Sequence, residues 1–480
     1  MRQRDALARE ADRDNRSREV FVAARPLRRR AAPARPGIDE SRTRIYYWWL
    51  LLALFFEYVR PGAFVPVINA IKLGTIIPGA LFVVTFFAPG LRPWNEIFSD
   101  RYVKWLVAFI VLIAISVPFA TVTMYAYNVL TNVLTQFTLF MMIARIATSL
   151  ARLRGIFATL IAAHVAIVLL NPALVLTPEV RSYIRGAPFL GDGNDFGLSV
   201  SILIPMAVEI ARHARSRFVT VLAWTSLAAM LLAVIGTQSR GASLAVAAVF
   251  IFLWRYSTRK FASFVVIAFV GLAVMVVASD SYLNRMGTIA NYEQDGSAEG
   301  RLDAWGASIR MAIDHPVTGV GAGQFPMEFG RHYRGGLYAG RWLTAHSMYF
   351  LVLGELGVTG VVALIALVIG SPLALLSLRR RVLAAPDVPS PEWRQESERF
   401  LCTLAAGCIG FAVAGAFLSV AYYPHVFVLT AVTASARLVI GSGLARQDAT
   451  VRAANPKVST RAGNRVGKRR RNFTPDPSAH

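Results

Sequence analysis

Long apolar blocks alternate with short polar connections along the chain, and this alternation constrains the fold more than any other feature. A helix needs about 17 to 25 apolar residues to cross a bilayer. Twelve segments approach this length, at about 45–59, 71–88, 103–120, 126–146, 154–172, 195–210, 218–236, 241–254, 261–278, 346–370, 400–420 and 423–441. The first and eighth are short for a spanning helix. The pattern predicts an all-α polytopic membrane protein with about 12 transmembrane helices.

The composition agrees with this prediction. Hydrophobic residues make up 55% of the 480 residues and charged residues only 16%, against about 25% charged in soluble domains. The two cysteines, Cys402 and Cys408, lie in one apolar segment. Their spacing suits one helix and is not typical of a disulfide framework or a zinc site.

The net charge of +23 would indicate nucleic acid in a soluble chain. Here the positive charge is better explained by membrane topology. Twelve spans put both termini on the same side of the membrane. If that side is the cytoplasm, the inner segments are 1–44, 89–104, 145–154, 211–217, 255–260, 379–399 and 437–480. They hold 40 of the 51 Lys and Arg residues, as the positive-inside rule requires. We therefore predict a multi-pass membrane protein with both termini cytoplasmic, in contact with membrane lipids and not with nucleic acid.

This topology predicts five regions in chain order. They are a basic cytoplasmic tail (1–44), an N-terminal transmembrane bundle (45–278), a periplasmic loop (279–345), C-terminal transmembrane helices (346–441) and a basic disordered cytoplasmic tail (442–480).

The connection 279–345 is far longer than the others, and loops of this length are usually functional. Its arginines, which are unusual on the outer side, are Arg285, Arg301, Arg310, Arg331, Arg334 and Arg341. Within it we expect short helices, including an amphipathic piece at Ala304–Ile313 that stops at His315-Pro316. The glycine run 319–323 lacks the Gly-Lys-Ser/Thr of a nucleotide loop, and we interpret it as a turn that lets a lipid or sugar approach closely.

The predicted outer face offers few reactive groups. His315, His332, His346 and His425 are spaced unlike a zinc motif, and the outer loops contain no Asp-x-Asp pair, no Gly-x-Ser-x-Gly elbow and no cysteine. The sequence therefore predicts no metal and no cofactor. What remains is arginine, whose fork matches phosphate oxygens, and His346, a natural general base. Together they indicate transfer of a group from a phosphate-linked donor to an alcohol.

Each of these residues also has a structural interpretation. An outer arginine often snorkels to lipid headgroups, although Arg240, between two spans, would be costly without an anion. His346 can simply cap its helix. Asp195 is expected to cap a helix N-terminus. Glu355 is expected to be a buried structural partner, with an arginine as its partner.

Several short motifs occur in a recognisable order. They are Gly193-Asn194-Asp195-Phe196-Gly197, Ser239-Arg240-Gly241, Gly300-Arg301-Leu302-Asp303-Ala304-Trp305, His315-Pro316 with Gly319-Val320-Gly321-Ala322-Gly323-Gln324-Phe325, and Ala345-His346-Ser347-Met348-Tyr349 ahead of Glu355-Leu356-Gly357. Over about 190–370 the chain resembles the O-antigen ligase/polymerase family of bacterial envelope glycan enzymes.

The resemblance implies a lipid-dependent glycosyltransferase-like membrane fold and an undecaprenyl-pyrophosphate-linked glycan as donor. It implies metal-independent transfer with inversion, in which Arg240 and Arg301 hold the pyrophosphate and His346 acts as base. The acceptor implied is lipid A-core for ligases, another glycan for polymerases and a protein Ser/Thr for O-oligosaccharyltransferases. Among these we favour a lipid or glycan acceptor.

Two other classes stay open. A polysaccharide transporter or flippase would also have about twelve spans, but such proteins usually show internal repeats and polar residues at the midplane, and no repeat relates the two halves of this chain. The other class is a non-catalytic subunit of a polysaccharide export system, which substitution of the predicted base would distinguish from an enzyme.

Overall fold

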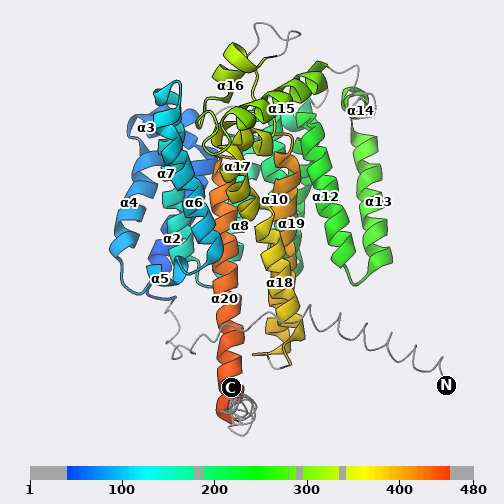
Figure 1. The fold of residues 1–480 in the computed structure, drawn as a ribbon. Helices are drawn as coiled ribbons and strands as arrows, with labels where there is room; N and C mark the ends of the chain where they lie inside the picture. Colours follow the sequence, from blue (N-terminus) through cyan, green and yellow to red (C-terminus); the bar gives the residue numbers. More distant parts are fainter. Residues whose placement is uncertain are drawn as a thin grey trace, which may run out of the picture. The chain divides into compact units, whose positions relative to one another are not determined.

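The structure, a computed structural model, describes residues 40–177, 184, 189–278, 280–287, 296–334, 342–386 and 388–454. Residues Ile38–Val451 form one compact unit. Within the described residues every regular element is helical (Figure 1). The predicted all-α fold class is therefore confirmed.

Each of the twelve predicted apolar segments contains a helix. These helices are α2 (Arg44–Val59), α4 (Leu73–Phe87), α6 (Arg101–Ser116), α7 (Thr123–Ile146), α8 (Leu150–Leu170), α10 (Gly193–His213), α11 (Arg217–Thr237), α12 (Arg240–Tyr256), α13 (Lys260–Val277), α17 (Met348–Val368), α19 (Pro391–Gly415) and α20 (Pro424–Ala454). Among the described residues, eight helices are long and apolar enough to cross a membrane, and Leu73–Phe87 and Lys260–Val276 are shorter apolar helices. The chain is a multi-pass membrane protein.

Further helices and turns connect these twelve. They are α3 (Pro66–Ala70), α5 (Trp94–Ile97), α9 (Ala173–Leu176), α14 (Asp280–Gly287), α15 (Gly296–Asp314), α16 (Phe325–Glu328), a π turn at Phe329–Tyr333, α18 (Gly370–Ala384) and 3-10 turns at Pro61–Ala63 and Val117–Phe119. The expected amphipathic piece is part of α15, which ends immediately before His315-Pro316. Proline lacks the N–H that would continue a helix.

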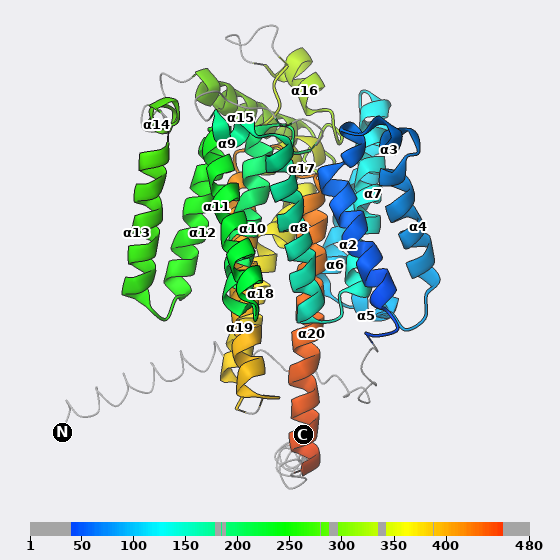
Figure 2. The same cartoon turned by 180° about the vertical axis from the view of Figure 1, so that it is seen from behind.

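Helix α10 lies at the centre of the bundle, where it packs against α8, α11, α12 and α19 (Figure 2). Small residues allow this close packing. A Cβ added at Gly197 would lie 2.4 Å from the Cβ of Ala242 on α12, and one added at Gly407 on α19 would lie 2.9 Å from the carbonyl oxygen of Ile202. The first turns of α10 and α12 are therefore held side by side.

The glycine run after α15 has a different role from the one we expected. Gly319, Gly321 and Gly323 all have positive φ, at 59°, 101° and 73°. A Cβ on Gly319 would lie 2.3 Å from the backbone of Glu355, and the N–H of Gly321 donates to the carbonyl oxygen of Glu355 at 2.9 Å. The expectation that a lipid or sugar approaches this turn is wrong, because protein atoms fill the space: α17 at Gly319, Ala120 at Gly321 and Val129 at Gly323.

Helix α17 is interrupted where the glycine run contacts it. Gly357 has φ 65° and ψ −164°, so the carbonyl groups before it lose their helical partners. The N–H groups of Val320 and Gly321 bond to the carbonyl oxygens of Gly354 and Glu355, and the N–H of Val358 bonds to that of Pro316, each at 2.9 Å. The loop after α15 is thereby joined to the middle of α17.

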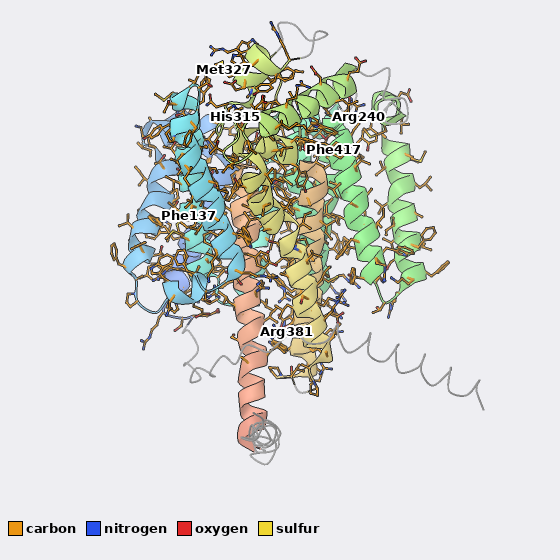
Figure 3. The ribbon with its side chains drawn as sticks, viewed as in Figure 1. Phe137, Arg240, His315, Met327, Arg381 and Phe417 are labelled. Atoms are coloured by element: carbon orange, nitrogen blue, oxygen red, sulfur yellow. The ribbon has the colours of Figure 1, made fainter. Side chains whose placement is uncertain are left out.

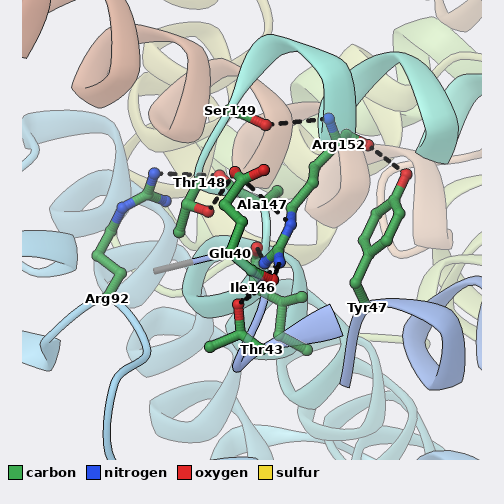
Figure 4. Close-up of polar contacts among 9 residues, drawn as sticks. All are labelled: Glu40, Thr43, Tyr47, Arg92, Ile146, Ala147, Thr148, Ser149 and Arg152. Carbon is green, nitrogen blue, oxygen red and sulfur yellow. Dashed lines mark hydrogen bonds and ion pairs between the residues drawn. The ribbon is translucent and has the colours of Figure 1, made fainter. Parts of the chain in front are cut away.

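Buried arginines cluster beside the C-terminus of α7 and just before α5 (Figure 4), and α5 lies at the end of the bundle away from α15 (Figure 1). Arg92 donates to the carbonyl oxygens of Ala144 and Ala147, and Arg152 donates to that of Ile146 at 2.8 Å and to Thr43 Oγ1 at 2.7 Å. These carbonyl groups lie at the C-terminus of α7, where no helical donor remains. Arginine satisfies them and complements the negative end of the helix dipole.

Two of the basic segments lie at the same end of the bundle. Arg381 and the connections α12–α13 and α18–α19 lie at the end away from α15, whereas Arg240 and His315 lie at the same end as α15 (Figures 1 and 3). We call these the basic end and the α15 end. The segments 255–260 and 379–399, counted above as inner loops, thus share the basic end.

Candidate functional site

Five parts of the chain that are distant in sequence meet at the α15 end. They are the first turns of α10 and α12, helix α15, the segment 342–347 before α17, and residues 416–423, which we call the α19–α20 turn. Direct contacts join them, as described below. The three predicted site residues lie on three of these parts: Arg240 begins α12, Arg301 lies on α15 and His346 lies just before α17.

His346 has an unusual backbone conformation. Its φ is 47°, in the left-handed region that non-glycine residues rarely adopt and that is enriched at functional sites. Both neighbours are buried, with Ala345 and Ser347 exposed by 0% and 1%. Ser347, and not His346, occupies the N-cap position of α17. The side chain of His346 is half-buried. It projects from a sharp backbone turn, which we call the His346 corner, between two buried residues.

Trp305 of α15 holds this corner in place. Its indole Nε1–H donates to the carbonyl oxygen of Ala345 at 2.9 Å, and its ring stacks on Phe350 with centroids 4.8 Å apart and planes 10° apart. Arg301 lies four residues before Trp305, on the same face of α15. One helix thus carries Arg301 and fixes the backbone next to His346.

Electrostatics connect His346 to two charged neighbours. Burial lowers the pKa of His346, the positive charge of Arg301 lowers it further, and the negative charge of Asp192 partly opposes both. Arg301 and Asp192 therefore lie close enough to act on the imidazole. The result is a neutral histidine at neutral pH, which is the form that can accept a proton.

Arg240 occupies the first turn of α12. Gln238 before it has φ 51°, and the hydroxyl of Ser239 accepts from the N–H of Ala242 at 3.1 Å as the N-cap. Thr237, Gln238 and Ser239 are all buried. This tight turn places Arg240 at a helix N-terminus, where the free N–H groups and the helix dipole favour an anion.

The α19–α20 turn joins the other parts, and sequence reasoning missed it. Phe417 lies against Gly241, where an added Cβ would be 3.3 Å from the Cβ of Phe417. Ser419 Oγ lies 2.8 Å from Thr344 Oγ1, two residues before His346. The only signal in the sequence is the tyrosine pair before Pro424, and tyrosines at the end of a span usually indicate a membrane interface.

The two tyrosines of this turn contact acidic residues whose roles differ from our expectations. Tyr422 donates to Glu355 Oε2 at 2.7 Å, and Glu355 also accepts from the N–H of Phe325 at 3.0 Å. The expectation of an arginine partner for Glu355 is wrong, because a backbone N–H and a phenol satisfy this buried carboxyl group. Tyr423 donates to Asp195 Oδ2 at 3.4 Å.

The N-cap of α10 is Asp192, three residues before Asp195, so the expectation that Asp195 caps this helix is wrong. Asp192 has the extended conformation of an N-cap, and its Oδ1 accepts from the N–H of Asn194 at 2.8 Å. Asp195 already lies inside the first helical turn. The first turn of α10 thus presents two carboxyl groups, one near His346 and one bonded to the α19–α20 turn.

The other arginines and histidines of the long loop play smaller parts. Arg310 donates to the carbonyl oxygen of Tyr333 at 2.6 Å, and His332 Nδ1 lies 2.9 Å from Glu328 Oε2. Arg331 and Arg334 are exposed; Arg341 and the side chain of Arg285 lie outside what the structure describes. In the described part of the chain, no three His, Cys, Asp or Glu side chains come together as metal ligands.

These features define a class: a multi-pass helical membrane protein with a constrained histidine and two arginines at one end of its bundle. Residues 225–365 match the family model described as O-antigen ligase. This match confirms the resemblance to the O-antigen ligase/polymerase family seen in the motifs, and it supports a glycosyltransferase-like ligase or polymerase role in envelope glycan synthesis. A comparison with curated proteins finds no match.

The matched segment contains Arg240, Arg301 and His346. The first turn of α10 and the α19–α20 turn lie outside it, although both contact the same site. Part of the site is thus built from segments that the family model does not cover.

Proposed function

We propose that this protein transfers a glycan from an undecaprenyl-pyrophosphate donor to an acceptor hydroxyl at the periplasmic face of the inner membrane, as an O-antigen ligase does. One observation carries the proposal. His346 is held at φ 47° beside Trp305, with its pKa lowered by burial and by Arg301. A neutral, constrained histidine next to an arginine is suited to deprotonating a hydroxyl beside a phosphate group.

Arg240 and Arg301 would bind the donor pyrophosphate. A diphosphate presents oxygens to more than one guanidinium, and each fork can bind in a bidentate way. The N-terminus of α12 adds backbone N–H groups and its positive dipole at Arg240. As the bond between the sugar and the pyrophosphate breaks, negative charge grows on the pyrophosphate, and these fixed positive groups stabilise that charge.

His346 would act as the general base. It accepts the proton of the acceptor hydroxyl while the hydroxyl oxygen bonds to the anomeric carbon. The bond from that carbon to the pyrophosphate oxygen breaks, and its electron pair leaves with undecaprenyl pyrophosphate. Attack from the side opposite the leaving group inverts the anomeric configuration. Arginine supplies the charge neutralisation here, so we propose a reaction that needs no metal.

The proposed orientation of the protein in the membrane is based on where its basic segments lie. The basic end carries the segments 255–260 and 379–399 and the buried Arg92 and Arg152 cluster, and basic loops stay in the cytoplasm. The α15 end, with the site, would then face the periplasm. Lipid-linked donors are available there, and both termini would be cytoplasmic.

A lipid-core or glycan acceptor is our first choice, with polymerisation and protein O-glycosylation as alternatives. Deletion of the gene followed by glycan analysis separates them. Lipopolysaccharide without long chains, together with lipid-linked polymer, indicates a ligase. Accumulated single repeat units indicate a polymerase, and unchanged glycans with an unglycosylated secreted protein indicate an oligosaccharyltransferase.

The decisive biochemical test uses purified protein in proteoliposomes with a lipid-linked glycan donor and a soluble acceptor. His346→Ala should retain donor binding and lose transfer, whereas His315→Ala, at the end of α15, should transfer normally. Normal transfer by His346→Ala would refute the assignment of the base. Transbilayer movement of the donor without any transfer would instead identify a flippase.

A further inference from the structure

Two histidines that the proposed reaction does not use meet inside the bundle. His164 of α8 and His425 of α20 both lie within hydrogen-bond distance of Ser199 Oγ on α10, at 2.7 Å and 2.9 Å. All three residues are buried, with exposures of 0%, 3% and 2%. Ionisable side chains in the spans of a membrane protein are costly and usually have a specific role.

The bonding partners determine where the protons lie. His164 Nδ1 is 2.8 Å from the carbonyl oxygen of Leu160, which can only accept, so Nδ1 carries a hydrogen. In a neutral ring His164 Nε2 is then an acceptor, and the hydroxyl of Ser199 donates to it. Because this hydroxyl has one hydrogen, His425 Nε2–H must donate to Ser199 Oγ.

This assignment leaves a bare lone pair on His425 Nδ1. That atom is buried and has no hydrogen-bond partner in the described part of the chain. Aromatic rings surround the imidazole: Phe411 stacks on it at 6.2 Å, and Tyr58 and Phe189 meet it edge-on at 5.9 Å. Buried polar atoms of native proteins almost always have a partner, so Nδ1 requires a donor.

A small cavity lies at the same place. It has a volume of about 10 Å³, and its polar lining consists of Tyr58, His164, Ser199 and His425. This is about the space that one water molecule needs, and a buried water also needs two or more polar partners. The polar side chains on the wall that are not already used in the Ser199 contacts described above are Tyr58 and, through Nδ1, His425.

We propose that this cavity is a binding site for one water molecule, which donates to His425 Nδ1 and completes a hydrogen-bond relay through His425 and Ser199 to His164. The relay joins α20, α10 and α8 in the interior of the bundle. Ser199 lies one helical turn below Asp195 on α10, and His425 follows Tyr423 by two residues. The relay therefore anchors the α19–α20 turn directly beneath the Tyr423–Asp195 contact.

Solid-state NMR of the full chain, labelled with ¹⁵N-histidine and reconstituted in bilayers, tests this proposal without any activity assay. His164→Asn and His425→Asn variants assign the two signals. We expect a neutral Nδ1–H ring for His164, a neutral Nε2–H ring for His425, and magnetisation transfer from water protons to His425 Nδ1. A hydrogen on His425 Nδ1, in a neutral or a doubly protonated ring, or the absence of the water contact, would overturn the proposal.

A pair of matched variants tests whether the water occupies this cavity, independently of the hydrogen bonds between the histidines and Ser199. Val428→Ile adds one methylene group to the cavity wall, whereas Val439→Ile makes the same change elsewhere on α20. The first should abolish the water contact of His425 and the second should preserve it. An unchanged water signal in a folded Val428→Ile protein would contradict the assigned cavity.

Discussion

The indole N–H of Trp305 donates a hydrogen bond to the carbonyl oxygen of Ala345 at 2.9 Å. This one contact joins α15, which carries Arg301, to the residue before His346. It fixes the peptide plane that precedes a residue with φ 47°. The spacing between the proposed donor site and the proposed base thus depends on an aromatic residue to which the proposed reaction assigns no chemical role.

Trp305→Phe tests this positioning role. Phenylalanine keeps the stacking on Phe350 and loses the N–H donor, so the corner at His346 loosens while α15 stays packed. We expect kcat to fall about tenfold, the equivalent of one hydrogen bond, with KM for the donor nearly unchanged. Trp224→Phe, at an exposed position on α11, is the control. Wild-type kcat in Trp305→Phe, alongside an inactive His346→Ala, would exclude the positioning role.

The pH profile should report the pKa of His346. Because burial and Arg301 lower this pKa, the imidazole stays neutral through pH 7, and kcat/KM should fall only as the pH drops through the lowered value. Asp192→Asn removes the carboxylate that raises the pKa and keeps a good N-cap. We expect the acid limb to move to lower pH in this variant, as followed by rate measurements and by NMR titration of His346. A shift toward higher pH would contradict the assignment.

Substitution of arginine by lysine tests the proposed donor site. A point charge does not replace a bidentate fork, so Arg240→Lys and Arg301→Lys should each lose most transfer activity, by about tenfold or more. Arg310→Lys, which changes a contact with the carbonyl oxygen of Tyr333, should stay near wild type. Transfer should also persist in EDTA. Full activity of both lysine variants, or complete inhibition by EDTA, would exclude arginine as the group that neutralises the pyrophosphate.

Cysteine labelling tests the orientation. In a background without Cys402 and Cys408, Val317→Cys lies at the α15 end and Ala384→Cys, at the last residue of α18, lies at the basic end; both positions are exposed. A membrane-impermeant maleimide should label residue 317 in intact spheroplasts and residue 384 only after the membrane is opened. If both residues are labelled from one side, the proposed topology is wrong.

The glycine run predicts a stability difference. Gly319→Ala places a Cβ at φ 59° and 2.3 Å from the backbone of Glu355, so α17 or the loop must shift, at a cost of about 1 to 3 kcal/mol. Gly74→Ala on α4 meets open space and should be neutral or stabilising by up to about 1 kcal/mol. Thermal unfolding in detergent measures both. Equal melting temperatures for the two variants would contradict the packing of Gly319.

The sequence by itself determined the all-helical membrane fold, because lipid leaves the backbone few ways to satisfy its hydrogen bonds and apolar length is a local property. It also predicted the helix at Ala304–Ile313 and its end at His315-Pro316, since amphipathic period and proline act locally. The family followed from the order of short motifs. Arg240, Arg301 and His346 could be selected because arginine is unusual on the predicted outer side and because arginine and histidine are chemically specific.

Tertiary structure alone decided how these residues are held. The Trp305–Ala345 bond and the contacts of the α19–α20 turn join parts of the chain that are dozens to hundreds of residues apart. Such contacts surround His346, whose φ is positive. Sequence periodicity carries no information about such pairs. The same reason explains the errors at Glu355 and the glycine run. Their partners are the N–H of Phe325, the hydroxyl of Tyr422 and the backbone of α17, and no local pattern in the sequence identifies them.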